Sequence, residues 1–344
     1  MCVILAYVMV DIRFYDISSS SKESGFNSLD QVHGALEGEG IAWLDILKPD
    51  EKVKEFLVGL DIDELIIEDI FGHADTTALK FSNHRYIVVN ARDADNRLDT
   101  EPLAIIMLNN VLVTLRHSPI PAINVFRKRV EEIHEDDLQL GVDFLLYELL
   151  DAVADDWTPI LGRYSRDLDE LEFQVFDPSK KYDDLLEGLH DLKRKLRQAN
   201  KSIESLNSVT MRMIKPGERF VAYNCQQYFN DLHQLSISLL KRCTNYSAGA
   251  TSSRDTYLSN ISMQLSQSNA QLTEVMTTLT IIGAIMLPLT LIAGIFGMNN
   301  EDLPTELIGG FWGIMMFMSL FALVMLIYFW RKGWIGSPKR QEPT

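Results

Sequence analysis

Residues 279–299 read LTIIGAIMLPLTLIAGIFGMN, and this stretch decides the fold. No charged residue occurs in the 20 positions of 279–298. A helix rises about 1.5 Å per residue, so a stretch of this length spans the ~30 Å hydrocarbon core of a bilayer. The sequence therefore predicts a transmembrane helix at 279–298.

A second apolar stretch, at 307–330, contains no charge in 24 positions. Between the two stretches, residues 299–306 carry three acids but no lysine or arginine. Basic residues instead precede the first stretch and follow the second one. Because basic residues favour the cytosolic side of a membrane, both termini are predicted to be cytosolic. Residues 299–306 then form an external loop, and residues 331–344 a cytosolic tail.

The chain before the first apolar stretch is predicted to be one long helix. No proline occurs between Pro216 and Pro288, so a helix from about 218 to 297 would be roughly 120 Å long. Residues 217–278 would be its cytosolic stalk, with Gly249 as its weak point. Residues 121–216 show apolar positions at helical spacing and are interrupted at Asp177-Pro178, which predicts two long antiparallel cytosolic helices.

Residues 1–120 predict a cytosolic α/β domain. Strands are expected at 86–89, 103–107 and 111–115, with a turn at Asn109-Asn110, and helices at 49–59 and 63–70. Residues 1–10 are apolar but lack a basic start and are followed by Asp11 and Arg13, so a strand is expected rather than a signal peptide. The predicted fold class is an α+β membrane protein, with this domain, a long helical stalk and two C-terminal transmembrane helices.

Composition excludes several classes of function. The net charge of −16 argues against binding nucleic acid, whose phosphates need a basic surface. Three isolated cysteines and seven histidines show no disulfide framework and no zinc-ligand spacing. The sequence contains no nucleotide-binding loop and no Ser-His-Asp set. We therefore predict that the protein is not an enzyme, is not an ATP-driven pump and uses no organic cofactor.

Phe296-Gly297-Met298-Asn299 stands at the outer end of the first apolar stretch, and the second stretch ends 14 residues before the C-terminus. This arrangement resembles the CorA family of divalent-cation (magnesium) channels. Segments that resemble family segments in the same order extend the similarity over most of the chain: 66–70, 145–152, 228–231 and 274–276. The resemblance implies a funnel-shaped homopentamer in a bacterial inner membrane, with the first transmembrane helix lining its axis and Mg²⁺ as the transported ion.

The resemblance makes Gly297, Met298 and Asn299 the selectivity filter. Mg²⁺ keeps its water shell tightly and prefers octahedral oxygen ligands, so a ring of neutral oxygens wide enough for a hydrated ion suits it. Asn299 supplies an amide oxygen at the pore mouth, and Gly297 is expected to let the backbone turn there. The alternative is that Asn299 only caps a helix end.

If the first transmembrane helix lines a pore, the residues on its pore-facing side must recur at about every 3.5 positions. The residues with this spacing that are expected to line the pore are Thr273, Met276, Leu279, Thr280, Gly283, Leu287, Thr290 and Gly294. The resemblance implies that Met276 and Leu279 narrow the pore at its inner edge, where apolar constrictions close by dewetting, and that Thr290 offers hydroxyls to water or a hydrated ion. Thr273 and Leu287 depart from the Asn and Met common in the family. The alternative is ordinary helix packing.

Four cytosolic acids are expected to form a regulatory Mg²⁺ sensor. By resemblance, Glu68 and Asp69 form one side of a site between subunits, Asp231 faces them from the neighbouring subunit, and Asp151 completes a second site. Carboxylates brought together across an interface repel unless a cation lies between them, so bound Mg²⁺ would hold the channel closed. The alternative is that these are solvated surface carboxylates.

In the external loop, Glu301 and Asp302 are expected either to concentrate cations at the entrance or to be merely solvated. The predicted function is passive Mg²⁺ uptake, with Co²⁺ and Ni²⁺ as further candidate ions, gated by intracellular Mg²⁺. Its partners are other copies of the chain, the lipid bilayer and divalent cations. The rivals are a zinc, cobalt or nickel transporter of the same superfamily, with or without proton coupling, and a non-conducting membrane scaffold.

Overall fold

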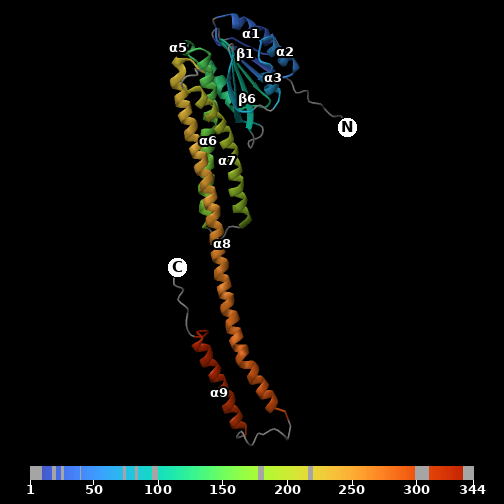
Figure 1. Ribbon diagram of the computed structural model, residues 1–344, viewed down its shortest axis with the longest axis vertical. Coiled ribbons are helices and arrows are strands. Elements are labelled where there is room, and N and C mark those ends of the chain that lie inside the picture. Colours follow the sequence, from blue (N-terminus) through green and yellow to red (C-terminus); the bar gives the residue numbers. More distant parts are fainter. Residues whose placement is uncertain are drawn as a thin grey trace, which may run out of the picture. The chain divides into compact units, whose positions relative to one another are not determined.

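The computed structural model describes residues 10–17, 21–24, 27–38, 40–72, 75–81, 84–94, 100–176, 182–215, 220–298 and 310–335. The chain forms two compact units, residues 1–257 and 258–344. Helix α8 (Gln226–Phe296) contributes residues to both units (Figure 1). The strand expected at 1–10 lies outside the described residues apart from Val10.

Within the described residues, one mixed sheet of seven strands forms the centre of the first unit. The order is β2-β1-β3-β7-β6-β5-β4, and only β3 and β7 pair in parallel. The three strands predicted between 86 and 115 are confirmed as β5, β6 and β7, and the strand bounds are β1 Asp11–Asp16, β2 Ser21–Ser24, β3 Ala42–Leu47, β4 Thr77–Lys80, β5 Arg85–Arg92, β6 Thr100–Met107 and β7 Val111–Arg116.

Three helices cover one face of this sheet: α1 (Asn27–Glu37), α2 (Glu51–Gly59) and α3 (Glu64–Phe71). Alternate residues of β3 (Ala42, Leu44 and Ile46) enter the same buried cluster as the apolar side of α2 and α3. Asp50 and Asp63 cap α2 and α3 by accepting hydrogen bonds from Val53 N and Leu65 N. Both helices predicted in this region are confirmed, within two residues at each end.

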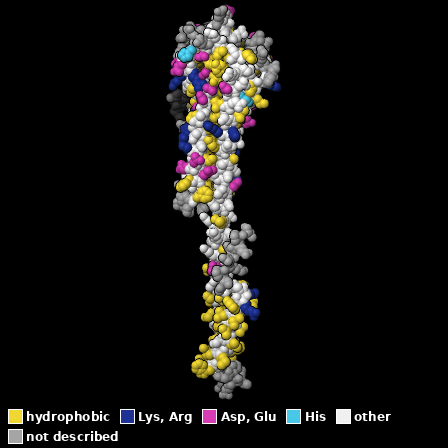
Figure 2. Space-filling view, turned by 90° about the vertical axis from the view of Figure 1, so that its left-hand side faces the viewer, with side chains coloured by type: hydrophobic (Ala, Val, Ile, Leu, Met, Phe, Trp, Pro, Cys, Tyr) yellow, Lys and Arg dark blue, Asp and Glu magenta, His cyan; other side chains and the backbone are white. Residues whose placement is uncertain are grey.

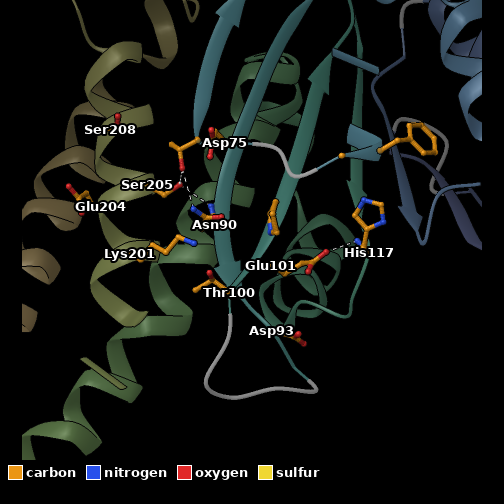
Figure 3. A pocket seen from close by; sticks show the side chains of 14 residues that line it. Asp75, Asn90, Asp93, Thr100, Glu101, His117, Lys201, Glu204, Ser205 and Ser208 are labelled. Atoms are coloured by element: carbon orange, nitrogen blue, oxygen red, sulfur yellow. Dashed lines mark hydrogen bonds between the residues drawn. The ribbon is translucent and has the colours of Figure 1, made fainter. Parts of the chain in front are cut away.

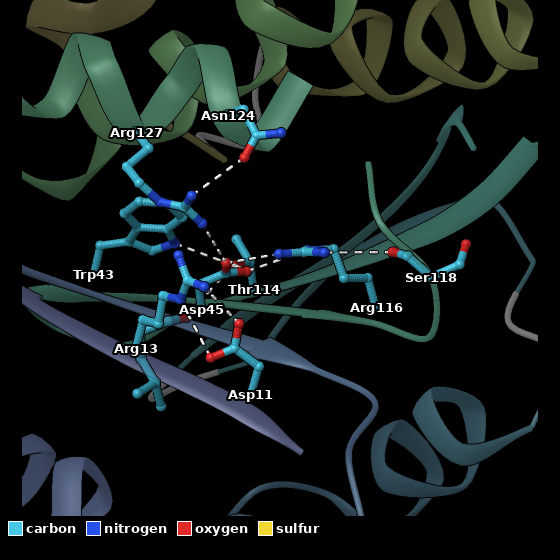
Figure 4. Close-up of polar contacts among 10 residues, drawn as sticks. Asp11, Arg13, Trp43, Asp45, Thr114, Arg116, Ser118, Asn124 and Arg127 are labelled. Carbon is cyan, nitrogen blue, oxygen red and sulfur yellow. Dashed lines mark hydrogen bonds and ion pairs between the residues drawn. The ribbon is translucent and has the colours of Figure 1, made fainter. Parts of the chain in front are cut away.

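The opposite face of the sheet packs on α4 (Pro121–Glu132), α6 (Val142–Val175) and α7 (Tyr182–Met213). Trp43 points from β3 toward α4, where its ring meets Phe126 with centroids 4.7 Å apart. Beside it, Asp45 is 2% exposed and accepts hydrogen bonds from Arg116 Nη2 at 2.8 Å and Thr114 Oγ1 at 3.0 Å (Figure 4). Because an unpaired buried carboxylate is costly, this network is what allows a charge inside β3.

Helices α6 and α7 are the two long helices predicted from 121–216, and the break predicted at Asp177-Pro178 falls between them. The short helix α5 (Glu135–Leu138) precedes α6, and a 3₁₀ turn (Tyr223–Cys225) precedes α8. Helix α8 continues unbroken through Gly249, where an added Cβ would lie 2.9 Å from Leu168 Cδ2. Gly249 therefore marks a close approach of α6 and α8, and the helix is continuous there.

The second unit contains the C-terminal part of α8 and the helix α9 (Gly310–Arg331). Both helices are long and apolar enough to cross a membrane, and their apolar stretches are almost wholly exposed in the single chain. Figure 2 shows hydrophobic side chains gathered over this part of the chain. Two apolar C-terminal helices were predicted, and both are present.

Candidate ion pathway and regulatory sites

Helix α8 ends at Phe296, directly before the predicted filter. Gly297 N donates a hydrogen bond to Ala293 O at 2.9 Å, and a Cβ on Gly297 would lie 2.9 Å from the same oxygen. Gly297 is not among the described glycines with positive φ, so a close backbone approach, and not a left-handed turn, requires glycine here. Met298 is 65% exposed, and Asn299 lies outside the described residues.

All eight predicted pore-lining residues lie on α8. Between residues 279 and 294 the helix contains no charged residue. Seven of them are exposed and Gly283 is partly exposed, but so is most of the helix circumference. Exposure in one chain therefore does not distinguish a pore-facing side from a lipid-facing side. The rest of the described chain leaves most of the apolar surface of α8 uncovered.

The threonine hydroxyls on α8 are oriented by the helix itself. Thr273, Thr280 and Thr290 each donate a hydrogen bond to the carbonyl oxygen four residues earlier, at 2.7–2.8 Å. With its proton used in this way, each hydroxyl oxygen presents only lone pairs outward. Such oxygens are acceptors for the water shell of a cation. Pro288, which has no N–H, leaves the Ala284 carbonyl without its usual helical donor.

Glu68 and Asp69 lie on the exposed face of α3, opposite the buried side of that helix. Leu65 shares this face at helical spacing and is 71% exposed. Burial raises the pKa of Tyr86, and the charge of Asp69 raises it further. Glu68 and Asp69, the acids predicted to form part of a sensor, are exposed in the single chain and lie next to an exposed apolar side chain.

Asp151 has a counter-ion within its own chain. Arg129 on α4 contacts Asp151 Oδ2 at 2.8 Å, Glu148 Oε2 at 3.2 Å and Asp155 Oδ2 at 2.6 Å. Burial raises the pKa of Glu148 and of Asp151, although Arg129 acts in the opposite direction. Three carboxylates therefore share one guanidinium. Glu148 and Asp155 were missed from the sequence, where their spacing on one face of α6 was the available signal.

Asp231 is exposed on the second turn of α8, near the aromatic ring of Tyr147. The pKa of Tyr147 is raised to about 12, mainly by burial. The negative charges of Asp151, Glu148 and Asp231 add to this effect, in that order. Tyr147 also packs on Tyr228, with ring centroids 5.1 Å apart. The structure thus places Asp151 and Asp231 around one tyrosine.

No described contact within one chain joins Glu68 or Asp69 to Asp151 or Asp231. Over the described ranges, no three His, Cys, Asp or Glu side chains gather closely enough to hold a metal ion. A site made from these acids would need carboxylates of a second copy. The loop residues Glu301 and Asp302 lie outside the described part of the chain.

A polar pocket of about 1050 Å³ lies between α7 and the sheet (Figure 3). Lys201 points from α7 toward Asn90 on β5, whose backbone N donates to Ser205 Oγ at 2.9 Å. At the far side, Glu101 accepts a hydrogen bond from His117 N at 2.7 Å. None of the predicted site residues lines this pocket, and sequence reasoning did not find it because its walls come from separate strands and α7.

Known proteins are similar to this chain over most of its length. The family model described as CorA-like Mg²⁺ transporter protein matches residues 38–332. The cobalt/magnesium transport protein CorA of Thermotoga maritima is 28% identical over 83% of this chain and 79% of its own length. The putative metal ion transporter YfjQ of Bacillus subtilis is 27% identical over 86% of this chain and 90% of its own.

A solved structure is similar over nearly the whole chain. The complete CorA magnesium transporter from Methanocaldococcus jannaschii superposes with a TM-score of 0.65 at 21% identity, covering 97% of this chain and 100% of that one. At that identity the likeness shows the fold alone. It includes the N-terminal α/β domain, the long helix and the two apolar C-terminal helices.

Proposed function

The chain belongs to the CorA-like family of Mg²⁺ transporters, and from this we propose that it is a passive channel for Mg²⁺ uptake. Transport of divalent cations across a membrane is the activity of that family. The uptake would be driven by an inside-negative potential, at about 2.3 kcal/mol per charge per 100 mV. The protein would span the inner membrane of a bacterium, with both termini in the cytosol.

The observation that supports this most is the uncharged, exposed stretch of α8 that ends at Phe296, directly before Gly297. A fixed charge in the pathway would bind a divalent cation too tightly for release. Threonine oxygens and, at the mouth, the Asn299 amide are neutral acceptors that suit an ion still holding its water. Met276 and Leu279 would supply the apolar constriction.

Two transmembrane helices cannot enclose a pathway, so the proposal requires several copies. We take the homopentamer implied by the family, with α8 of each copy around the axis and α9 outside. The exposed apolar surfaces of both helices support burial against other copies and lipid. The external acids Glu301 and Asp302 would raise the local cation concentration at the entrance.

Intracellular Mg²⁺ would close the channel by bridging Glu68 and Asp69 of one copy to Asp231 of the next. All three carboxylates are exposed in the single chain, which leaves them available to a partner. Asp151 would belong to the second site, where Arg129 already neutralises part of the charge of Glu148, Asp151 and Asp155. A cation at the second site would have to compete with that arginine.

Uptake into liposomes containing the purified protein tests the proposal. Each ion of a panel (Mg²⁺, Co²⁺, Ni²⁺ and Zn²⁺) is supplied outside, with and without a pH gradient, and a dye inside reports entry. We expect Mg²⁺ entry that needs no pH gradient. Zn²⁺ entry that follows the proton gradient would favour the zinc-type transporter, and absence of flux for every ion would favour a non-conducting scaffold.

A further inference from the structure

The C-terminal end of α9 is closed by a compact cap built from residues 328–334. Gly333 has φ of +73°, and its N donates to Trp330 O, while Trp334 N reaches back to Phe329 O, both at 3.0 Å. This pair of bonds is a Schellman motif, which ends a helix and reverses the chain. The accompanying apolar contact is present too, since Trp334 stacks on Phe329 with centroids 5.6 Å apart and planes 14° apart.

The cap holds a cation between two aromatic rings. Lys332 Nζ lies 5.5 Å from the ring centroid of Tyr328 and 5.3 Å from that of Trp334. Both distances are within the range of cation–π attraction. The ammonium group, which would otherwise move on a flexible stem, is therefore placed before any ligand arrives. Arg331 adds a second positive charge beside it, and residues 310–335 contain no aspartate or glutamate.

The exposure of the rings indicates where this cap lies. Trp330 is 65% exposed and Trp334 47% exposed, although each has an apolar body. Tryptophan and tyrosine at the end of a membrane-spanning helix favour the headgroup region, where one edge meets lipid and the other meets water. Two basic side chains at that depth face the phosphates of the same leaflet.

From this geometry we propose that residues 328–334 bind the headgroup phosphate of an anionic phospholipid. Lys332 and Arg331 pair with the phosphate, while Trp330 and Trp334 lie against the glycerol and upper acyl region. Charge complementarity selects an anionic lipid over a zwitterionic one, because the cap has two cations and no anion. The proposal requires that α9 crosses a membrane, but it does not depend on which ion the protein transports.

Native mass spectrometry of the full-length protein tests the proposal, with phosphatidylglycerol and phosphatidylcholine titrated separately. We expect tighter binding of phosphatidylglycerol. Lys332→Gln and Arg331→Gln should each weaken it about five-fold, as expected for one basic residue at an anionic surface, without changing phosphatidylcholine binding. Gly333→Ala keeps every charge but strains the cap, and should weaken phosphatidylglycerol binding as well.

Trp312→Ala is the matched control, because Trp312 is an exposed tryptophan at the other end of α9 with no basic neighbour. It should leave the binding of both lipids unchanged. The proposal is overturned if the unaltered protein binds both lipids equally, or if both charge-removing variants retain wild-type affinity for phosphatidylglycerol. The first outcome requires no variant, and lipid binding is read without any ion flux.

Discussion

Asp45 shows how a single buried charge shapes the cytosolic unit. It lies inside β3 and is held by Arg116, by Thr114 and, at 3.4 Å, by Arg127. Burying a carboxylate is tolerable only with such partners, and removing it leaves two arginines uncompensated. The network also fixes the register of β3 against β7, because its groups come from both strands.

We therefore expect Asp45→Ala to lower the free energy of unfolding by about 3–5 kcal/mol, the usual cost of breaking a buried ion pair from one side. Denaturant unfolding of the purified protein measures it. Asp191→Ala is the control, since Asp191 pairs with Lys195 on the surface of α7, where such pairs contribute about 0–1 kcal/mol. Equal effects from the two variants would refute the role given to Asp45.

Gly297 lies where the proposed filter begins, and its backbone approaches the preceding turn of α8 closely. An alanine Cβ would be forced to within 2.9 Å of Ala293 O, a backbone atom that cannot turn away. We expect Gly297→Ala to strain the end of α8 by about 1–3 kcal/mol and to reduce Mg²⁺ flux roughly tenfold or more. Gly162→Ala in α6, where nothing lies within 4 Å of the added carbon, should leave flux unchanged. Normal flux in Gly297→Ala would contradict this account of the close approach at Gly297.

At the scale of elements, local pattern predicted most of the architecture. The strands β5–β7, helices α2 and α3, the pair α6–α7 and the long α8 all follow from periodicity and from the positions of proline. β3 was missed because Asp45 interrupts an apolar run, and its partner Arg116 is 71 residues away in sequence. Compensation by a distant residue cannot be read from a local window.

The candidate sites show the same limit. Resemblance to the family, and not residue type or spacing, singled out the acids on α3, α6 and α8 and suggested their role. The pairing of Asp151 with Arg129 depends on how α4 packs on α6, which the sequence pattern does not specify. The reason for glycine at 297 also depends on how closely the backbone there approaches the Ala293 carbonyl oxygen, which is a matter of geometry and not of composition.

The elements α3 and α8 carry the proposed Mg²⁺ sensor, so their acids should control gating. We expect Asp69→Ala and Asp231→Ala each to raise the internal Mg²⁺ concentration needed to close the channel, because each removes a ligand from a site shared between copies. Currents recorded at increasing internal Mg²⁺ measure this shift. Asp255→Ala, an exposed acid further along α8, should have no effect. Unchanged inhibition in both sensor variants would exclude this mechanism.

For the molecule as a whole, one buried histidine (His84) and one partly buried histidine (His233) connect stability to pH. Burial lowers the pKa of His84, against the charges of Asp63 and Asp61, and burial also lowers the pKa of His233. Below about pH 6.5, the reference value for histidine, these two side chains therefore bind more protons in the unfolded chain than in the folded one. The stability contributed by the neutral imidazoles is present above that pH and is lost as the pH falls through the lower folded values.

Thermal unfolding in detergent should accordingly show a Tm that falls as the pH is lowered from 7.5 to 5.5. The double variant His84→Gln/His233→Gln should reduce that slope, because it removes both titrating groups. His190→Gln, which alters an exposed histidine of α7, serves as control. A slope equal to that of the unaltered protein in the double variant would mean that other groups cause the pH dependence.

In the assembly that we propose, several copies of α8 surround the ion pathway with the face that includes Leu287. A cysteine at 287, in a chain whose three native cysteines are serine, places a ring of thiols in that pathway, whereas a cysteine at 285 lies on the opposite face of the helix. Mg²⁺ flux into liposomes is measured before and after a positively charged thiol reagent. The account predicts that the reagent abolishes flux in Leu287→Cys and spares it in Ile285→Cys. Unblocked flux in Leu287→Cys, or block only in Ile285→Cys, would contradict it.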